Sequence, residues 1–484
     1  MRNGTDAHGR TAQGTETALV TGLDAYGGSR PARGDRRPAP RVTRSRADGD
    51  TGAAGRTRAA VAAAALLGLS LTALALLCVA QRLPMDDVLV YRAEGDAVAH
   101  GTDLYGFTVT RWRLPATYPP FAAILFVPTG WLPLAAVKAL FIAGNSVLVA
   151  VLVHLSLRLA GRAYGPGRRL PVLLAATAAA LWLEPVFQTI VFGQINLLLA
   201  CLVLWDLGRP DSARGKGLAV GVAAGIKLTP AVFAVYLLLT GRVRAGLTAL
   251  AGFAGTVALG ALVLPGASVE FWTRRLFETT RVGKAWIVDN QSLQGLAARL
   301  AHTAEPGALW LIPAVLVALA GAVLARDVYL RHGRDGWGVL VTALGALLVS
   351  PISWSHHWVW CVPLLALLAP PGAGRRARWG RRAALAVGVV FTARSLWLVP
   401  KAGGLDLRLA WWCQPLASPY PLLAVALLAA VAVVCYSASG SAPLPGSAPG
   451  SGDVPRADVP SGACPGPRPG SGSPVSRSCE STMR

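Results

Sequence analysis

Long apolar stretches recur along the chain, separated by short polar turns or by loops that carry arginine and lysine. A helix needs about 20 mostly apolar residues to cross the hydrocarbon core of a bilayer. Because no soluble fold uses so many separate apolar stretches, we expect an all-α polytopic integral membrane protein. The predicted spanning helices are residues 59–80, 135–157, 170–184, 186–207, 246–265, 307–325, 337–350, 357–370, 382–399 and 418–437.

Two further apolar stretches contain residues that interrupt a helix. The stretch 217–240 contains Lys227 and Pro230, and it predicts either a broken helix or a tight helical hairpin. The stretch 119–133 is bracketed by prolines and predicts an interfacial or re-entrant segment. Counting the hairpin as two segments gives a bundle of about 11–12 transmembrane segments.

The basic residues of the loops predict the orientation of the chain, since cytoplasmic loops of membrane proteins are enriched in lysine and arginine. We place the arginine-rich N-terminus in the cytoplasm, treat 217–240 as a hairpin and treat 119–133 as non-spanning. Every compact basic loop then falls on the cytoplasmic side, both termini are cytoplasmic, and loops 81–134 and 266–306 lie outside. The basic residues concerned are Arg158, Arg162, Arg168, Arg169, Arg209, Arg214, Lys216, Arg242, Arg244, Arg326, Arg331, Arg334 and the arginine cluster at 375–382.

Polar tails flank the apolar region. Residues 1–58 are expected to form a disordered, basic cytoplasmic tail. Residues 438–484 are rich in serine, proline and glycine, and they are expected to form a second disordered cytoplasmic tail. The first apolar run begins too far along the chain for a signal peptide. Residues 59–437 are therefore the expected membrane domain.

Composition agrees with a membrane protein and limits the other classes. The chain is 53% hydrophobic and 14% charged, whereas soluble domains carry about 25% charged residues. Its 15 tryptophans suit a membrane interface. A net charge of +22 would also fit a nucleic-acid-binding protein. Because the basic residues lie in short loops between spans, no nucleic-acid partner is expected. The seven cysteines show no spacing typical of a zinc site.

Two adjacent carboxylates, Asp86 and Asp87, follow the first predicted span. Partial burial at a membrane boundary raises the pKa of a carboxylate and suits a general base. The alternative is a pair of solvated acidic residues at a helix end.

Three polar side chains interrupt apolar sequence. Lys227 either faces an anion such as a lipid-linked phosphate or extends its ammonium group to the membrane interface. Gln194 and Asn196 lie near the predicted outer start of an apolar helix, where amides either take part in a site or hydrogen-bond neighbouring helices.

Two polar clusters fall in the predicted outer loops. Asn290-Gln-Ser-Leu-Gln294 offers amides that suit sugar hydroxyls. His356 and His357 lie between tryptophans in an outer turn, and paired histidines can bind phosphate or metal or relay protons. Four cations precede the amide cluster and suit phosphate, namely Arg274, Arg275, Arg281 and Lys284.

In this order along the chain, these segments resemble the polyprenol-phosphate-mannose-dependent mannosyltransferases of glycosyltransferase family 87, which have the GT-C fold. The resemblance covers residues 86–358 and does not extend to the tails. The matching segments are Asp87-Val-Leu-Val-Tyr-Arg92, Leu104-Tyr105, Thr117-Tyr-Pro-Pro-Phe121, Gly193-Gln-Ile-Asn-Leu197, Ile226-Lys-Leu-Thr-Pro230, Asn290-Gln-Ser292 and Ser350-Pro-Ile-Ser-Trp-Ser-His-His357.

The resemblance implies a GT-C-like membrane domain that transfers a hexose, expected to be mannose, with inversion from a polyprenyl-phosphate donor to a glycan or glycolipid acceptor outside the plasma membrane. An acidic residue of the first outer loop serves as the base in this fold class. Asp87 occupies that place and Asp86 is its competitor. No cofactor is expected, and a divalent metal stays open because the class shares no single metal requirement. The residues expected at the donor phosphate or sugar are Arg92, Lys227, Asn290, Gln291, His356 and His357, with Tyr118, Gln194 and Asn196 as further site candidates.

The alternative function is a polytopic membrane transporter of a lipid-linked or small anionic substrate. Broken helices and an intramembrane lysine are typical of transporters. Transporters usually show paired repeats with a binding site near the midplane of the bilayer. Here the polar segments cluster at the predicted outer end and no repeat is evident, which favours the glycosyltransferase.

Overall fold

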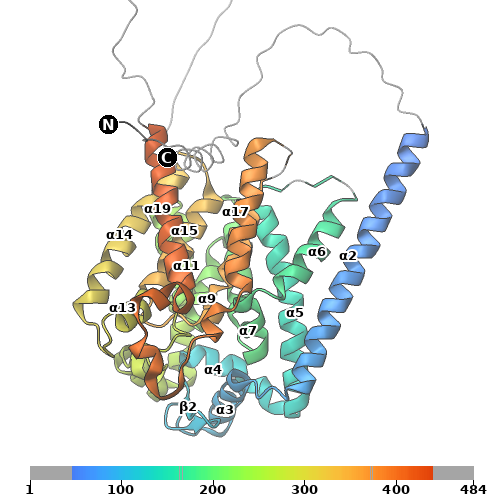
Figure 1. Ribbon diagram of the computed structural model, residues 1–484. Coiled ribbons are helices and arrows are strands. Elements are labelled where there is room, and N and C mark those ends of the chain that lie inside the picture. Colours follow the sequence, from blue (N-terminus) through green and yellow to red (C-terminus); the bar gives the residue numbers. More distant parts are fainter. Residues whose placement is uncertain (1–45, 163, 166, 371, 373, 440–484) are drawn as a thin grey trace, which may run out of the picture. The chain divides into compact units, whose positions relative to one another are not determined.

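Five helices long and apolar enough to cross a membrane form the frame of this computed structural model, which describes residues 46–162, 164–165, 167–370, 372 and 374–439 (Figure 1). They are α2 (Arg46–Ala80), α5 (Leu134–Leu159), α11 (Val243–Val263), α14 (Ala308–Leu330) and α19 (Pro419–Ser439). Helix α2 begins at Arg46, inside the stretch expected to be the N-terminal tail. The rest of that stretch, and residues 440–484 of the C-terminal tail, lie outside the described residues.

Shorter helices and turns of 3-10 helix fill the space between these five. The α-helices are α3 (Asp86–His100), α4 (Pro120–Phe126), α6 (Arg169–Ala180), α7 (Glu184–Phe192), α8 (Asn196–Leu207), α9 (Leu218–Ile226), α10 (Val232–Leu239), α12 (Pro265–Thr273), α13 (Leu293–Leu300), α15 (Asp335–Val349), α16 (Cys361–Leu368), α17 (Arg375–Thr392) and α18 (Gln414–Ala417). The 3-10 turns are η2 (Val127–Trp131), η3 (Thr229–Ala231), η4 (Arg275–Phe277), η5 (Thr279–Arg281), η6 (Ser355–Trp360), η7 (Ser395–Trp397), η8 (Ala402–Arg408) and η9 (Trp411–Cys413). Strands β1 (Thr108–Val109) and β2 (Leu114–Pro115) pair antiparallel, with Thr108 opposite Pro115.

The all-α multi-pass membrane fold predicted from the sequence is confirmed, but helices of spanning length are fewer than the 11–12 segments expected. Within the described residues five helices meet that length, or six if the bent pair α6 and α7 is one span. Five further apolar helices are only 10–17 residues long. The predicted spans were read as continuous apolar runs, whereas the folded chain breaks several of them at polar turns.

The predicted span 186–207 shows such a break most clearly. It is two helices, α7 and α8, separated at Gly193, whose φ of 71° is left-handed. Glycine adopts this conformation without strain. A Cβ atom there would lie 2.2 Å from Val88 Cγ2 of α3, so the glycine also admits a close approach of α3. The break leaves Gln194 and Asn196 at a helix start, where their amides can face a site.

The interrupted stretches fold as the sequence indicates. Gly217 lies against Ala245 at the start of α11, α9 runs beside α11, and α10 returns to Arg242 next to the same end of α11. The hairpin prediction for 217–240 is therefore confirmed, with Lys227 at its turn. Residues 120–131 form one short apolar helical segment, as expected for a non-spanning 119–133.

The basic loops meet at one end of the bundle, which we call the basic end. The Arg244 guanidinium donates to the Asp211 carbonyl oxygen at 2.6 Å, Arg242 pairs with Asp335 at 3.1 Å, and Arg162 donates to the Ala366 carbonyl oxygen. Figure 1 shows this end at the top and α3, α4 and β2 at the bottom. This one-sided gathering agrees with the loop charges used to predict the orientation.

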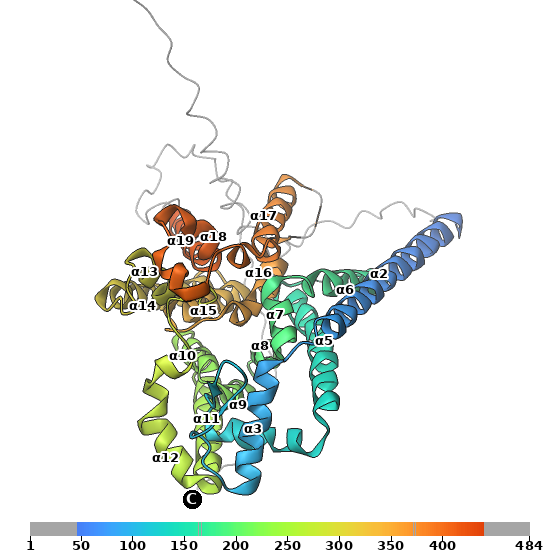
Figure 2. The same cartoon turned by 60° about the horizontal axis from the view of Figure 1, so that its bottom comes forward.

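Packing at the opposite end holds the two large loops together. A small buried cluster joins Ala97, Leu104 and Tyr105 of the first loop to Phe271 of α12. The Tyr105 and Phe271 rings stack with centroids 5.9 Å apart. Both Figures 1 and 2 show α2 running beside α6, and Leu74 and Cys78 near the end of α2 belong to the buried core. These contacts set the position of α3 and of the loop around Arg275.

Candidate functional site

A cavity of about 770 Å³ opens at the end of the bundle opposite the basic end. Its walls come from α3, the loop after β2, the α7–α8 break, the 217–240 hairpin turn, the η4–η5 segment and the turn before η6. Pockets of this size commonly hold small ligands. The predicted site residues that line it are Asp86, Asp87, Tyr118, Gln194, Lys227, His356 and His357.

The two carboxylates at the start of α3 have different surroundings. Asp87 is half-buried. Burial raises the pKa of Asp87 to about 6, while a hydrogen bond from Gln194 and the charge of Lys227 oppose that rise and the charge of Asp86 adds to it. Burial also raises the pKa of Asp86, which faces the charges of Arg111 and Lys138 instead. Asp87 is therefore the carboxylate that meets the other polar groups of the cavity.

A three-residue network holds Gln194 next to Asp87. The Tyr91 and Tyr118 hydroxyls donate to Gln194 Oε1 at 3.0 and 3.1 Å, and the two hydroxyl oxygens are 2.9 Å apart. The amide oxygen accepts both hydroxyls, and the NH2 group of Gln194 is the donor that faces Asp87. Three segments of the resemblance, in α3, before α4 and at the α7–α8 break, therefore meet at one point.

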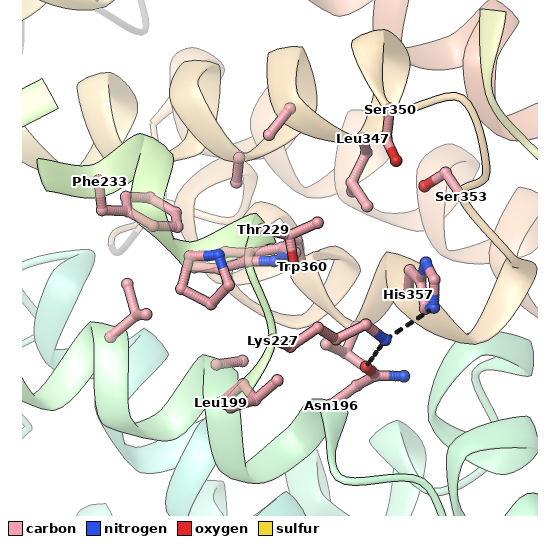
Figure 3. A pocket seen from close by; sticks show the side chains of 16 residues that line it. Asn196, Leu199, Lys227, Thr229, Phe233, Leu347, Ser350, Ser353, His357 and Trp360 are labelled. Carbon is pink, nitrogen blue, oxygen red and sulfur yellow. Dashed lines mark hydrogen bonds between the residues drawn. The ribbon is translucent and has the colours of Figure 1, made fainter. Parts of the chain in front are cut away.

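Lys227 is the centre of a second group of contacts (Figure 3). Its Nζ lies 3.0 Å from Asn196 Oδ1 and 3.0 Å from His357 Nε2. The same atom lies 5.6 Å from the centroid of the Tyr118 ring. Asn196 Nδ2 in turn donates to the His356 carbonyl oxygen at 3.2 Å. The lysine is thus held by a histidine and an amide, and its charge faces Asp87.

Three predicted donor-binding residues do not line the cavity. Arg92 donates to the carbonyl oxygens of Leu132 at 2.7 Å and Thr129 at 3.0 Å, so its guanidinium holds the end of η2. Asn290 and Gln291 are fully buried and form hydrogen bonds with neighbouring backbone. A buried amide must satisfy both its N–H donors and its oxygen acceptor, so the Asn290 and Gln291 side chains are engaged by the surrounding backbone and are not free to bind a ligand.

Asn290 supports the histidine turn instead, and the Gln291 side chain holds the chain at the start of α19. Asn290 Nδ2 donates to the Pro351 carbonyl oxygen at 3.0 Å, and its Oδ1 accepts from the Ser353 N–H at 2.8 Å. Gln291 Nε2 donates to the Ala417 carbonyl oxygen at 2.7 Å. The Asn290 amide therefore positions the segment that carries His356 and His357, whereas Gln291 contacts that segment only through its backbone N–H, which donates to the Ser353 carbonyl oxygen at 2.8 Å.

The structure also brings residues to the cavity that sequence reasoning did not select. Arg275 and Arg281 line it from the η4–η5 segment, and Lys401 lines it in an ion pair with Asp289 at 2.6 Å. Arg275 and Arg281 belong to the four cations that precede the amide cluster in the sequence, and this run of positive charge was the feature that could have identified them. The sequence around Lys401 carried no comparable signal.

Two buried carboxyls near the cavity also escaped selection. Glu94 accepts the Thr117 backbone N–H at 3.2 Å, and burial raises its pKa to about 8. Glu184 accepts from the Tyr420 hydroxyl at 2.7 Å and from Trp397 Nε1 at 3.3 Å. Both carboxyl groups anchor segments that carry cavity residues. Glu184 could have been identified from the sequence because it is an acidic residue inside an apolar run. Among the residues the structure describes, no group of three or more His, Cys, Asp or Glu could hold a metal ion.

Comparison with known proteins gives a consistent family assignment. The model of glycosyltransferase family 87 matches residues 116–351. A polyprenol-phosphate-mannose-dependent alpha-(1-2)-phosphatidylinositol mannoside mannosyltransferase of Mycobacterium tuberculosis is 34% identical over 359 residues, which cover 71% of this chain and 83% of that relative. The corresponding pentamannoside mannosyltransferase of the same species is 37% identical, over 67% of this chain and 77% of that relative.

One solved structure is also similar. The crystal structure of ArnT from Cupriavidus metallidurans bound to undecaprenyl phosphate aligns over 79% of this chain and 77% of that chain, with a TM-score of 0.35 and 17% sequence identity.

Proposed function

Because the chain belongs to glycosyltransferase family 87, we propose that it transfers mannose from a polyprenol-phosphate-mannose donor to a phosphatidylinositol mannoside or a related glycolipid. The chain is a multi-pass membrane glycosyltransferase, and the transporter alternative has no support from its relatives. The mannosyl donor and the glycolipid acceptor are proposed from the relatives, whose names carry both.

The observation that carries the mechanism is that Asp87 and Lys227 both line one cavity. Asp87 has a pKa of about 6, so it is mostly ionised at pH 7 while remaining basic enough to accept a proton. Lys227, held by His357 and Asn196, supplies positive charge in the same cavity. A base and a cation in one cavity suit a displacement in which one oxygen loses a proton and another gains negative charge.

The reaction that follows is a single displacement. Asp87 accepts the proton of an acceptor hydroxyl as its oxygen attacks the anomeric carbon of the donor. The bond from that carbon to the phosphate oxygen breaks, and the polyprenyl phosphate leaves with the electron pair. Lys227 stabilises the negative charge that develops on the phosphate. One displacement inverts the anomeric configuration.

The direct test is a transfer assay with the purified protein in lipid. Radiolabelled polyprenyl-phosphate mannose and purified phosphatidylinositol mannosides should yield a glycolipid with one additional mannose, released by an alpha-(1-2)-specific mannosidase. A polyprenyl-phosphate donor that carries a different sugar is the matched control and should give much less product. Label that stays on the donor with every glycolipid acceptor would refute the proposed acceptor class.

We also propose that the cavity opens on the extracytoplasmic side. The supporting observation is that α9 separates the cavity at Lys227 from the basic end at Gly217, and basic loops favour the cytoplasm. In a cysteine-depleted background, Thr102→Cys should react with an impermeant maleimide in intact cells. Ser212→Cys, in a loop of the basic end, should react only after lysis. The reverse pattern would overturn the orientation.

A further inference from the structure

A small pocket of about 60 Å³ adjoins the main cavity at Lys227 (Figure 3). Helices α8, α10 and α15 and the turn before η6 form its walls. Four residues line both the pocket and the main cavity, namely Lys227, Thr229, Ser350 and His357. A ligand in the main cavity can therefore reach the small pocket without leaving Lys227.

The pocket has a polar end and an apolar end. Figure 3 shows His357, Ser350 and Ser353 on one side of Lys227 and Phe233 on the other. The remaining lining is mostly aliphatic and includes Ala200 of α8 and Ala343 and Ala346 of α15. A headgroup with an apolar chain is the ligand type that such a lining accommodates.

The polar end contains a hydroxyl that lacks a partner. Ser353 is fully buried and lines the pocket, and its Oγ has no hydrogen bond among the described residues. Buried polar groups normally have a partner, so an orphaned hydroxyl in a pocket that a lysine also lines leaves a donor for an oxygen-rich ligand. A phosphate oxygen would accept from both Ser353 Oγ and Lys227 Nζ.

The apolar end is short. A cavity needs about 10–15 Å³ for each water-sized group, so this pocket takes only a few carbon-sized groups. The alanines provide this space, because larger side chains at their positions would fill it. A pocket of about 60 Å³ has room for one small branched unit of an isoprenoid chain.

We infer that this pocket binds the phosphate-linked isoprene unit of the lipid donor and selects donors by the branching of that unit. The inference rests on the proposed function, since it assumes a polyprenyl-phosphate sugar donor. The phosphate lies between Lys227 and Ser353, and the first isoprene unit packs against Ala200, Ala343 and Ala346. A straight alkyl chain lacks the branch that fills the pocket, so it loses these contacts.

The test compares two mannosyl phosphate donors, one with a polyprenyl chain and one with a straight alkyl chain of equal length. The wild-type enzyme should prefer the polyprenyl donor by about tenfold in kcat/KM, the scale of one hydrocarbon group in an apolar pocket. Ala346→Leu fills the pocket and should remove most of this preference, because the polyprenyl donor loses the contacts of its branch and its kcat/KM falls toward that of the straight-chain donor. Ala346→Val should give an intermediate preference.

Two further variants separate the alternatives. Ala320→Leu makes the same chemical change on the exposed face of α14 and should leave the preference unchanged. Ser353→Ala should lower kcat/KM for both donors, because both carry the phosphate. Equal loss of both donors in Ala346→Leu and Ala346→Val, an unchanged preference in both variants, or a wild-type enzyme without preference would each overturn the inference. A wild-type enzyme that uses neither mannosyl donor would instead contradict the proposed function.

Discussion

Replacement of Asp87 by asparagine should lower the rate of mannosyl transfer by about 10²–10⁴-fold, the usual contribution of a general base. Asparagine keeps the shape of the side chain but cannot accept the acceptor's proton. The protein should remain folded and should still bind its donor, because the Lys227 contacts with Asn196 and His357 do not involve Asp87. The measurements are kcat in the transfer assay and a separate donor-binding titration.

The pH profile identifies which carboxylate acts. A base works only when it is ionised, so the rate should fall as the pH drops through the Asp87 pKa of about 6. Asp86→Asn removes a negative neighbour that raises this pKa, so the fall should move to lower pH while the rate at pH 7 stays close to wild type. Near-normal turnover in Asp87→Asn, or collapse only in Asp86→Asn, would assign the base to the other residue.

Replacement of Lys227 by methionine should weaken donor binding by about 10- to 100-fold, the scale of one hydrogen bond to a charged group. Methionine keeps an unbranched apolar stem in the position of the lysine stem but removes the charge at the proposed phosphate position. Because Lys227 also lowers the pKa of Asp87, the acidic fall in rate should move to higher pH, opposite to its shift in Asp86→Asn. A donor-binding titration and a pH profile of the variant measure the two effects.

The matched control is Lys284→Met, which removes a cation from the exposed part of the loop after η5. Lys284 does not line the cavity, so donor affinity should match the wild-type value. Unchanged donor affinity in Lys227→Met would remove Lys227 from the phosphate site. A pH profile that does not move would show that its charge does not reach Asp87.

The segments of the site meet although they are far apart in sequence. Tyr91 and Gln194 are 103 residues apart, and Lys227 and His357 are 130 residues apart. Each segment is a break in regular helix, at the start of α3, at Gly193, at the 217–240 turn or before η6. Breaks in helices expose polar groups that the flanking helices cannot use, which explains why the candidate chemistry gathers there.

The sequence by itself determined the helical membrane architecture and the short segment after Pro120, and it limited 217–240 to a broken helix or a hairpin. These features depend on the length of apolar runs and on residues that interrupt them, which are local properties of the chain. The sequence also predicted that the basic loops lie at one end of the bundle, because lysine and arginine are enriched in the loops on one side of a membrane protein. The motif resemblance selected the segments that line the cavity.

Only the tertiary structure decided which polar residues within those segments face the cavity. Asn290 and Gln291 belong to a selected segment, yet they hydrogen-bond buried backbone, while Gln194 and Asn196 face Asp87 and Lys227. It also decided that the run 186–207 breaks at Gly193, where Val88 of α3 approaches. A side-chain amide looks the same in the sequence whether it supports the fold or lines a binding site. Its role depends on the hydrogen-bond partners that distant segments contribute. Those partners become neighbours only when the helices pack.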